Sequence, residues 1–211
     1  MNYELKTPEL LEIACPTGDS VMGGSQKWYP GRWERAAGCG PTTASNLIWY
    51  LARSRPELRM LYDAGSATKE RFVELMRELY RSMPPGIGGV NKPVIFTDGI
   101  TRFCDARGLA LAPHVLEVSS KLPERPDTHC VSEFIITALQ SDSPVGFLNL
   151  DSGTVKNLET WHWVTIIGFD AESISATIID KGQKQVISLN EWLITSRRGG
   201  AMVYLTGRTS E

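Results

Sequence analysis

The chain has 211 residues, of which 42% are hydrophobic, 9% aromatic and 22% charged. This composition is typical of a globular protein and excludes disordered, collagen-like and disulfide-stapled chains. The 22 Lys and Arg residues against 24 Asp and Glu give a net charge of −2, so we expect no nucleic-acid partner. No apolar run approaches the roughly 20 residues of a membrane-spanning helix, and the N-terminus lacks the order of a secretory signal. We therefore predict one cytoplasmic domain over residues 1–211, without a membrane span.

The first quarter of the chain predicts a short helix, a loop and a long helix. Thr7-Pro8-Glu9 is typical of a helix start, and this helix should run through Ile13. Residues 16–38 carry many Gly and Pro residues among aromatic side chains, which predicts an irregular loop. From Gly40 to Arg53, apolar residues recur at helical spacing. This pattern predicts the best-defined helix of the chain.

The middle of the chain is predicted to be mostly helical. The helices expected there lie around residues 56–62, 72–79, 96–104 and 131–138. A Gly-rich and Pro-rich loop should occupy residues 84–89, and residues 109–118 should be extended. We interpret residues 54–143 as a helical insertion in the domain.

The last third of the chain has the pattern of strands. They are expected at residues 145–150, 160–169, 174–180, 185–188 and 201–206, with a turn of helix at 190–194. Helices come first in the chain and antiparallel strands second. This order predicts the α+β fold class.

Four cysteines lie far apart, without the Cys-x-x-Cys or Cys/His spacing of a metal site, so we expect free thiols, no metal and no cofactor. Cys39 lies where the Gly-rich loop becomes the long helix. A helix N-terminus favours the nucleophilic thiolate, and the glycines on both sides leave the sulfur uncovered. The alternative is a small buried cysteine that packs as an apolar side chain.

One of the three histidines lies at a position suited to catalysis. His162 is near the start of a predicted strand, between Trp161 and Trp163, where a base could reach a cleft. Asp180 ends the next strand, and antiparallel pairing would place its carboxylate beside His162. The alternatives are a core histidine bonded to a backbone carbonyl and an aspartate that begins a turn.

Three segments resemble the papain-like cysteine peptidases, in the branch similar to bacterial double-glycine leader peptidases that process bacteriocins. They are Gly38-Cys39-Gly40-Pro41-Thr42-Thr43, the strand from Trp161 to Asp170, and Ile178-Ile179-Asp180. The resemblance implies a papain-like fold, with a helical N-terminal part that carries the nucleophile and an antiparallel sheet that carries His and Asp. It covers the Cys39 helix and residues 144–206. By this resemblance Cys39 is the nucleophile, His162 the general base and acid, and Asp180 the orienting carboxylate of a thiol protease acting on a peptide or protein.

Two departures from the family pattern concern the oxyanion and substrate sites. The family places a glutamine that binds the oxyanion about six residues before the cysteine, where this chain has Trp33. The nearest upstream glutamine is Gln26, 13 residues before Cys39 (39 − 26 = 13), and we assign it as the oxyanion donor. We expect Trp33, Trp161 and Trp163 to bind substrate. The alternative function is a catalytically inert papain-like scaffold that binds a peptide or partner protein in its cleft; the complete triad favours the enzyme.

Overall fold

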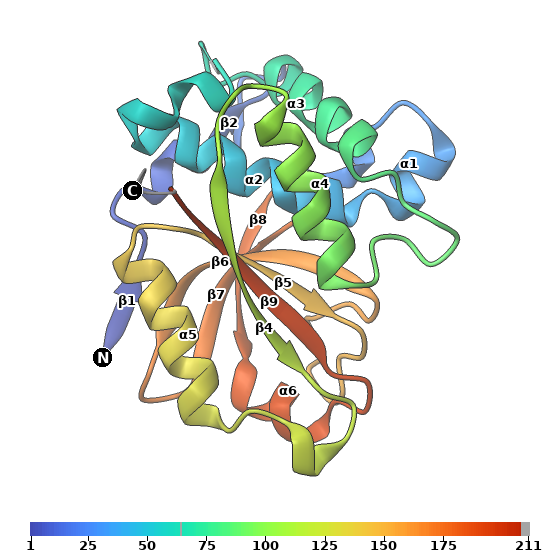
Figure 1. Cartoon of the computed structure of the whole chain (residues 1–211), viewed down its shortest axis with the longest axis vertical. Helices are drawn as coiled ribbons and strands as arrows, with labels where there is room; N and C mark the ends of the chain where they lie inside the picture. The colour runs from blue at the N-terminus through green and yellow to red at the C-terminus, as the bar shows by residue number, and fades with distance from the viewer. Residues whose placement is uncertain (64, 208–211) are drawn as a thin grey trace.

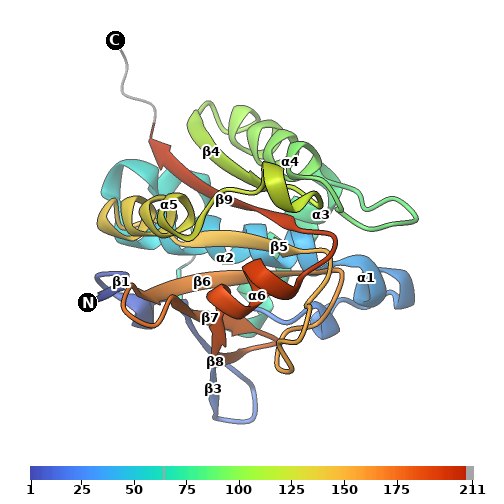
Figure 2. The same cartoon turned by 90° about the horizontal axis from the view of Figure 1, so that it is seen from below.

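A seven-stranded antiparallel sheet forms the centre of the computed structural model, which describes residues 1–63 and 65–207 (Figure 1). Along the sheet the strands are β4 (Leu111–Val118), β9 (Gly200–Gly207), β5 (Val145–Asn149), β6 (His162–Asp170), β7 (Ser175–Asp180) and β8 (Gln183–Ser188). Figure 2 shows this order, with β4 at one edge and β8 at the other. A short strand, β1 (Asn2–Glu4), pairs with the second half of β6.

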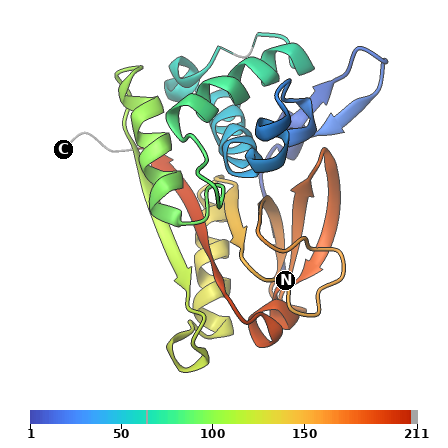
Figure 3. The same cartoon turned by 90° about the vertical axis from the view of Figure 1, so that its right-hand side faces the viewer.

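Helices are distributed over the whole chain but gather in its first two thirds. They are α1 (Arg32–Ala37), α2 (Cys39–Ser54), α3 (Lys69–Ser82), α4 (Pro93–Asp105), α5 (Thr128–Gln140) and α6 (Leu189–Thr195). Figure 3 shows the blue-to-teal segments of the N-terminal part above the orange and red strands. The predicted α+β class with a large antiparallel sheet is confirmed. Among the described residues, no helix is long and apolar enough to cross a membrane.

Helices cover both faces of the sheet, and the contacts of two neighbouring residues of β5 identify these helices. A side chain at Gly146 would contact Thr43 of α2 and Phe96 of α4. Phe147, the next residue, packs edge-on against Trp192 of α6 with ring centroids 4.7 Å apart. Because successive strand residues point to opposite faces, α2 and α4 cover one face and α6 the other.

The long helix α2 is the best-predicted element and the most deeply buried. All of its side chains from Gly40 to Ala52 are buried, because the sheet lies on one side and α3, α4 and the 3-10 turn Pro56–Leu61 lie on the others. A helix enclosed in this way is fixed by packing along its entire length. Its first residue, Cys39, is therefore placed by the hydrophobic core and not by a flexible connection.

Residues 16–38 do not form the irregular loop that their Gly and Pro content predicts. They contain β3 (Ser20–Met22), the 3-10 turn Gln26–Trp28 and α1. β3 pairs with β2 (Glu12–Ala14), so the first predicted helix is only the 3-10 turn Pro8–Leu11 and ends before Ile13. Local capping outweighs composition here, because the Glu34 side chain accepts the Gly31 N–H (2.8 Å) and starts α1.

Residues 54–143, predicted as a helical insertion, supply more than helices. α3 and α4 pack beside α2, and their predicted apolar stripes are buried. The extended segment of this region becomes β4, which pairs with β9 along its whole length at the edge of the main sheet. The middle of the chain is therefore part of the central sheet.

Candidate active site

The three residues of the predicted triad come from three elements that meet at one end of the sheet. Cys39 is the first residue of α2, His162 the first residue of β6 and Asp180 the last residue of β7. β6 and β7 are antiparallel neighbours, and they place the start of one strand beside the end of the other. After Asp180 the chain reverses through Lys181 and Gly182, with φ angles of 52° and 84°. These angles suit a two-residue hairpin turn, which fixes where β7 ends.

His162 and Asp180 form a short, part-buried hydrogen bond. The Nε2 atom of His162 lies 2.8 Å from Oδ1 of Asp180, and only 6% of His162 is exposed. Since Nε2 is engaged with the carboxylate, Nδ1 is the ring nitrogen left for Cys39. Burial lowers the pKa of His162, but hydrogen bonds to Asp180 and Cys39 more than reverse this and raise the pKa to about 10. The site therefore stabilises an imidazolium between a carboxylate and a sulfur.

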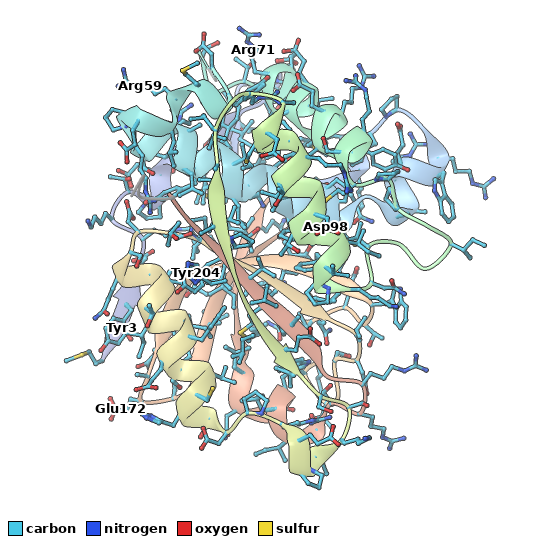
Figure 4. All side chains as sticks on the ribbon, in the orientation of Figure 1. Tyr3, Arg59, Arg71, Asp98, Glu172 and Tyr204 are labelled. Carbon is cyan, nitrogen blue, oxygen red and sulfur yellow. The ribbon has the colours of Figure 1, made fainter. Side chains whose placement is uncertain are left out.

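The other two histidines have contacts that explain them without catalysis. His114, on β4, stacks on Tyr204 at 4.5 Å and bonds to the Thr206 hydroxyl at 2.9 Å. Figure 4 shows Tyr204 near the middle of the molecule, where β9 passes beneath β4. His129 is exposed on α5, 3.3 Å from the Glu133 carboxylate. His162 is the histidine that lines a pocket together with Cys39.

The glycines around Cys39, predicted to leave the sulfur uncovered, also allow neighbouring segments to pack closely. A Cβ atom at Gly38 would clash with the backbone oxygen of Glu34, and one at Gly40 would come within 2.7 Å of Val90. Both glycines therefore permit α1 and the segment before α4 to approach the start of α2 closely. Cys39 itself is half-buried and lines two pockets.

The chain folds Gln26 back to the predicted triad despite its distance in sequence. Its half-buried side chain lines the same small pocket as Cys39, His162 and Asp180. Nε2 of Gln26 donates to the Arg35 carbonyl oxygen at 2.9 Å, which fixes the orientation of the amide. This bond uses one of the two protons of that NH₂ group. Within the described chain, Oε1 of Gln26 is buried and accepts no hydrogen bond, a state that buried polar groups seldom show.

Asn46 holds the site together and was missed by the sequence analysis. Its Nδ2 donates to the Thr165 hydroxyl, and its Oδ1 accepts the Gly24 N–H, both at 2.9 Å. The buried amide thereby joins α2, β6 and the segment that leads to Gln26. A signal exists in the sequence, because Asn46 is an amide within the predicted helix, two turns after Cys39 and on the same face.

The three predicted substrate-binding tryptophans line one pocket beside Cys39. Trp33 and Trp161 are 51% and 41% exposed, whereas Trp163 is buried and stacks on Phe96. Trp33 thus occupies a pocket wall and not the position of an oxyanion donor. The structure thus brings the three predicted tryptophans together. Trp163, however, forms the buried floor of the pocket and is not exposed for binding.

Carboxylates near His162 raise the question of a metal ion. Donor atoms of Glu159, His162 and Asp180 lie within 4.8 Å of one another. Glu159, however, forms an ion pair with the Lys181 ammonium, and His162 Nε2 already bonds to Asp180. An ion would have to break both interactions, so this donor set fits acid–base chemistry better than metal ligation.

No protein-family model matches the chain, and no curated protein matches it. The chemistry of the site is therefore argued from its geometry. A thiol at a helix start, an imidazole held by a carboxylate and a nearby amide donor are the groups that nucleophilic acyl transfer requires.

Proposed function

We propose that the protein is a cysteine peptidase or related amide hydrolase of the papain-like type, with Cys39, His162 and Asp180 as its triad. The observation that carries the proposal is the 2.8 Å bond between His162 and Asp180, in a pocket that Cys39 also lines. The pairing of β6 and β7 brings His162 and Asp180 together, and Cys39, which is far from both in sequence, lines the same pocket from the start of α2. The sequence resemblance to papain-like peptidases supports the same assignment.

In this mechanism the thiolate of Cys39 attacks the carbonyl carbon of a peptide bond, and an oxyanion forms on the carbonyl oxygen. When the C–N bond breaks, the imidazolium of His162 gives its proton to the leaving amine. The acyl group remains on Cys39 as a thioester. Water then attacks the thioester, His162 takes a proton from it, and cleavage of the C–S bond releases a carboxylic acid and restores the thiolate and imidazolium.

The other residues of the proposed site orient the His162 ring or stabilise the charges that form during the reaction. Asp180 holds the His162 ring in one orientation and stabilises its protonated form. The first N–H groups of α2 have no partners within the helix, so the N–H of Cys39 can face the oxyanion. Gln26 would supply the second donor through its remaining N–H. Asn46 is a positioning residue, since it ties the Gln26 segment to α2 and β6.

A second candidate function is an inert papain-like scaffold that binds a peptide or partner protein. The bond from Gln26 to the Arg35 carbonyl favours it, because one donor proton is used within the fold. The large exposed apolar side chains of Trp33 and Trp161 beside Cys39 also suit binding without chemistry.

Limited alkylation followed by peptide mapping tests the nucleophile. We expect iodoacetamide at neutral pH to modify Cys39 before Cys15 or Cys130 in the wild-type protein. His162→Ala should remove this preference, whereas the matched variant His129→Ala, at an exposed histidine of α5, should keep it. Even labelling of the cysteines, or equal effects of the two variants, would refute the assignment of the nucleophile.

A second experiment separates the enzyme from the scaffold. A pool of synthetic peptides is incubated with wild-type protein and with Cys39→Ala, and new termini are identified by mass spectrometry. Cleavage by the wild type alone is the expected result. A reactive Cys39 with no cleavage of any peptide would favour the binding scaffold.

A further inference from the structure

A hollow of about 570 Å³ lies at the end of α2 that is farthest from Cys39. Its lining includes the last turn of α2, the 3-10 turn Pro56–Leu61 and Leu10. Arg53, which lines it, follows Cys39 by 14 positions (53 − 39 = 14), or about 20 Å along the helix axis. None of the described residues that line this hollow lines either pocket at Cys39. We call it the distal hollow.

Arg53 brings a charged group to the wall of the distal hollow without partners for two of its nitrogen atoms. Within the described chain, Nε and Nη1 of Arg53 are shielded from water and have no hydrogen-bond partner. Buried polar groups are nearly always paired, and an arginine keeps its charge in a folded protein. Burial lowers the pKa of the Arg53 guanidinium, the direction expected for a cation that loses hydration. The fold therefore contains a cation that lacks the hydrogen bonds its burial requires.

The contacts that Arg53 does make leave these N–H groups unsatisfied. Its guanidinium carbon lies 5.4 Å from the centre of the Trp49 ring, which is a cation–π contact. Its place in the last turn of α2 also suits the negative end of the helix dipole. Both interactions favour a positive charge, but neither provides an acceptor atom for an N–H group. In the part of the chain that the structure describes, each ion pair involves other groups.

The rest of the distal hollow suits a ligand that has both an anionic group and an apolar body. Arg59, from the turn that follows α2, also lines the hollow and is exposed at the surface (Figure 4). Asp63 is the one acidic residue of the described lining, and its Oδ1 accepts the Gly65 N–H at 3.2 Å. Leu10 and Met60 add apolar surface, and 74% of Met60 is exposed. Two cations thus face one carboxylate beside an apolar wall.

We propose that the distal hollow binds a small organic anion, whose carboxylate or phosphate group pairs with Arg53 and Arg59 and whose apolar body packs on Leu10 and Met60. Guanidinium groups match the geometry of these oxyanions, and such a pair would supply the acceptors that Arg53 lacks. Because Arg53 lines the hollow, rotation of its long side chain can bring the shielded N–H groups to the anion. The volume lies within the roughly 300–1,000 Å³ of small-molecule sites. This inference does not rest on the proposed function.

Titration with simple anions tests the proposal. Nitrogen–proton correlation spectra that record the arginine Nε–H signals are collected with hexanoate, acetate, hexyl phosphate, inorganic phosphate or the neutral hexanamide, at constant ionic strength. The Arg53 signal, assigned by its absence from the spectrum of Arg53→Met, should move and saturate with hexanoate or hexyl phosphate, and the tighter of the two identifies the head group. Each buried methylene strengthens binding about fourfold, so acetate should bind at least about 10-fold more weakly than hexanoate. Hexanamide should leave the signal in place.

Two matched variants connect binding to the distal hollow. Arg53→Met keeps a long side chain against Trp49 but removes the N–H groups, so the Kd for the tighter anion, measured from the rise in thermal midpoint with ligand, should increase at least about 10-fold. Arg81→Met, at an exposed arginine of α3 outside the described lining, should bind like the wild type. Without ligand, Arg53→Met should unfold at the temperature of the wild type or above it, because it no longer buries an unpaired charge.

The outcomes decide between a ligand site and a structural arginine. If no anion moves the Arg53 signal, or if hexanamide binds as tightly as hexanoate, the inference is overturned. Equal binding of acetate and hexanoate, and of inorganic and hexyl phosphate, would overturn the assigned class of ligand. If Arg53→Met unfolds at a lower temperature and still binds like Arg81→Met, Arg53 has a structural role only. Arg59→Met, at an exposed residue, serves if Arg53→Met does not fold, and unchanged binding in that variant would also overturn the inference.

Discussion

Replacement of Asp180 by Asn is the sharpest test of the triad, because the size of its effect can be worked from the structure. The pKa of His162 rises from an ordinary value of 6.5 to about 10. At about 1.4 kcal/mol per pKa unit, Asp180 and Cys39 together stabilise the imidazolium by roughly 5 kcal/mol, net of burial. If Asp180 contributes half, its loss costs about 2–3 kcal/mol, or on the order of 10² in turnover. Loss of control over the His162 tautomer can raise this toward about 10⁴.

The pH dependence of stability and turnover gives the Asp180→Asn test a second expected result with a defined direction. A folded-state pKa above the unfolded value stabilises the fold below pH 6.5, and this contribution is lost as pH rises through about 10. Turnover of the wild type should fall over the same alkaline range, as His162 loses the proton that the leaving amine needs. In Asp180→Asn the alkaline limb should move to lower pH, and the stability difference from the wild type should shrink between about pH 8 and 11.

The assay measures turnover of a peptide that the wild type cleaves, together with urea unfolding, at several pH values. Asp98→Asn is the matched control, since Asp98 is exposed on α4 (Figure 4) and is not among the residues that line the two pockets at Cys39. It should match the wild type in every measurement. Equal turnover of Asp180→Asn and wild type, or an alkaline limb that does not move, would remove Asp180 from the site.

Three further predictions concern single residues. Iodoacetamide should leave Cys104 unmodified at neutral pH while Cys39 reacts, because burial raises the pKa of the Cys104 thiol to about 12. Early labelling of Cys104 in peptide maps would contradict this prediction. Gln26→Ala should lower turnover by about 10²- to 10³-fold, while the alkylation rate of Cys39 stays unchanged. Gln26→Glu, which replaces the NH₂ donor by a carboxylate, should have the same effect. Full turnover of either variant would mean that other groups bind the oxyanion. Asn46→Ala should lower the free energy of unfolding by about 1–3 kcal/mol, since it leaves the Gly24 N–H without its acceptor, and a variant as stable as the wild type would show that this bond matters little.

The sequence predicts those elements in which local pattern and packing agree. The helix expected from Gly40 to Arg53 is found as Cys39–Ser54, because its apolar spacing and Pro41 both favour a helix that the core then encloses. The strands around His162 and Asp180 lie within two residues of their expected bounds. The antiparallel pairing of β6 with β7 could also be predicted, since β6 precedes β7 directly. The Lys-Gly turn in turn predicts the pairing of β7 with β8.

Other features depend on contacts that no local pattern encodes. The Gly and Pro content of residues 16–38 predicts a loop, but side-chain caps and pairing with β2 order this segment. The bond from Trp161 to Gly88 and the bridge made by Asn46 join residues more than seventy and more than one hundred positions apart. Such contacts are set by how helices pack on the sheet, so they appear only in the folded chain.

The parts of the proposed site divide between two regions of the chain. The reacting groups come from the segments that resemble papain-like peptidases, namely the start of α2 and the strands β6 and β7. One wall of the pocket that Trp33, Trp161 and Trp163 line beside Cys39 comes from residues 87–91, which lie outside that resemblance. Trp161 and Trp163, which flank His162, donate their indole N–H groups to the Gly88 and Val90 carbonyls of this segment, and Val90 also lies close to Gly40, the residue after Cys39. The side chain of Ile87 is fully exposed and takes part in none of these contacts, so Ile87→Ala should leave the reactivity of Cys39 toward iodoacetamide unchanged; a changed alkylation rate would show that this wall acts on Cys39.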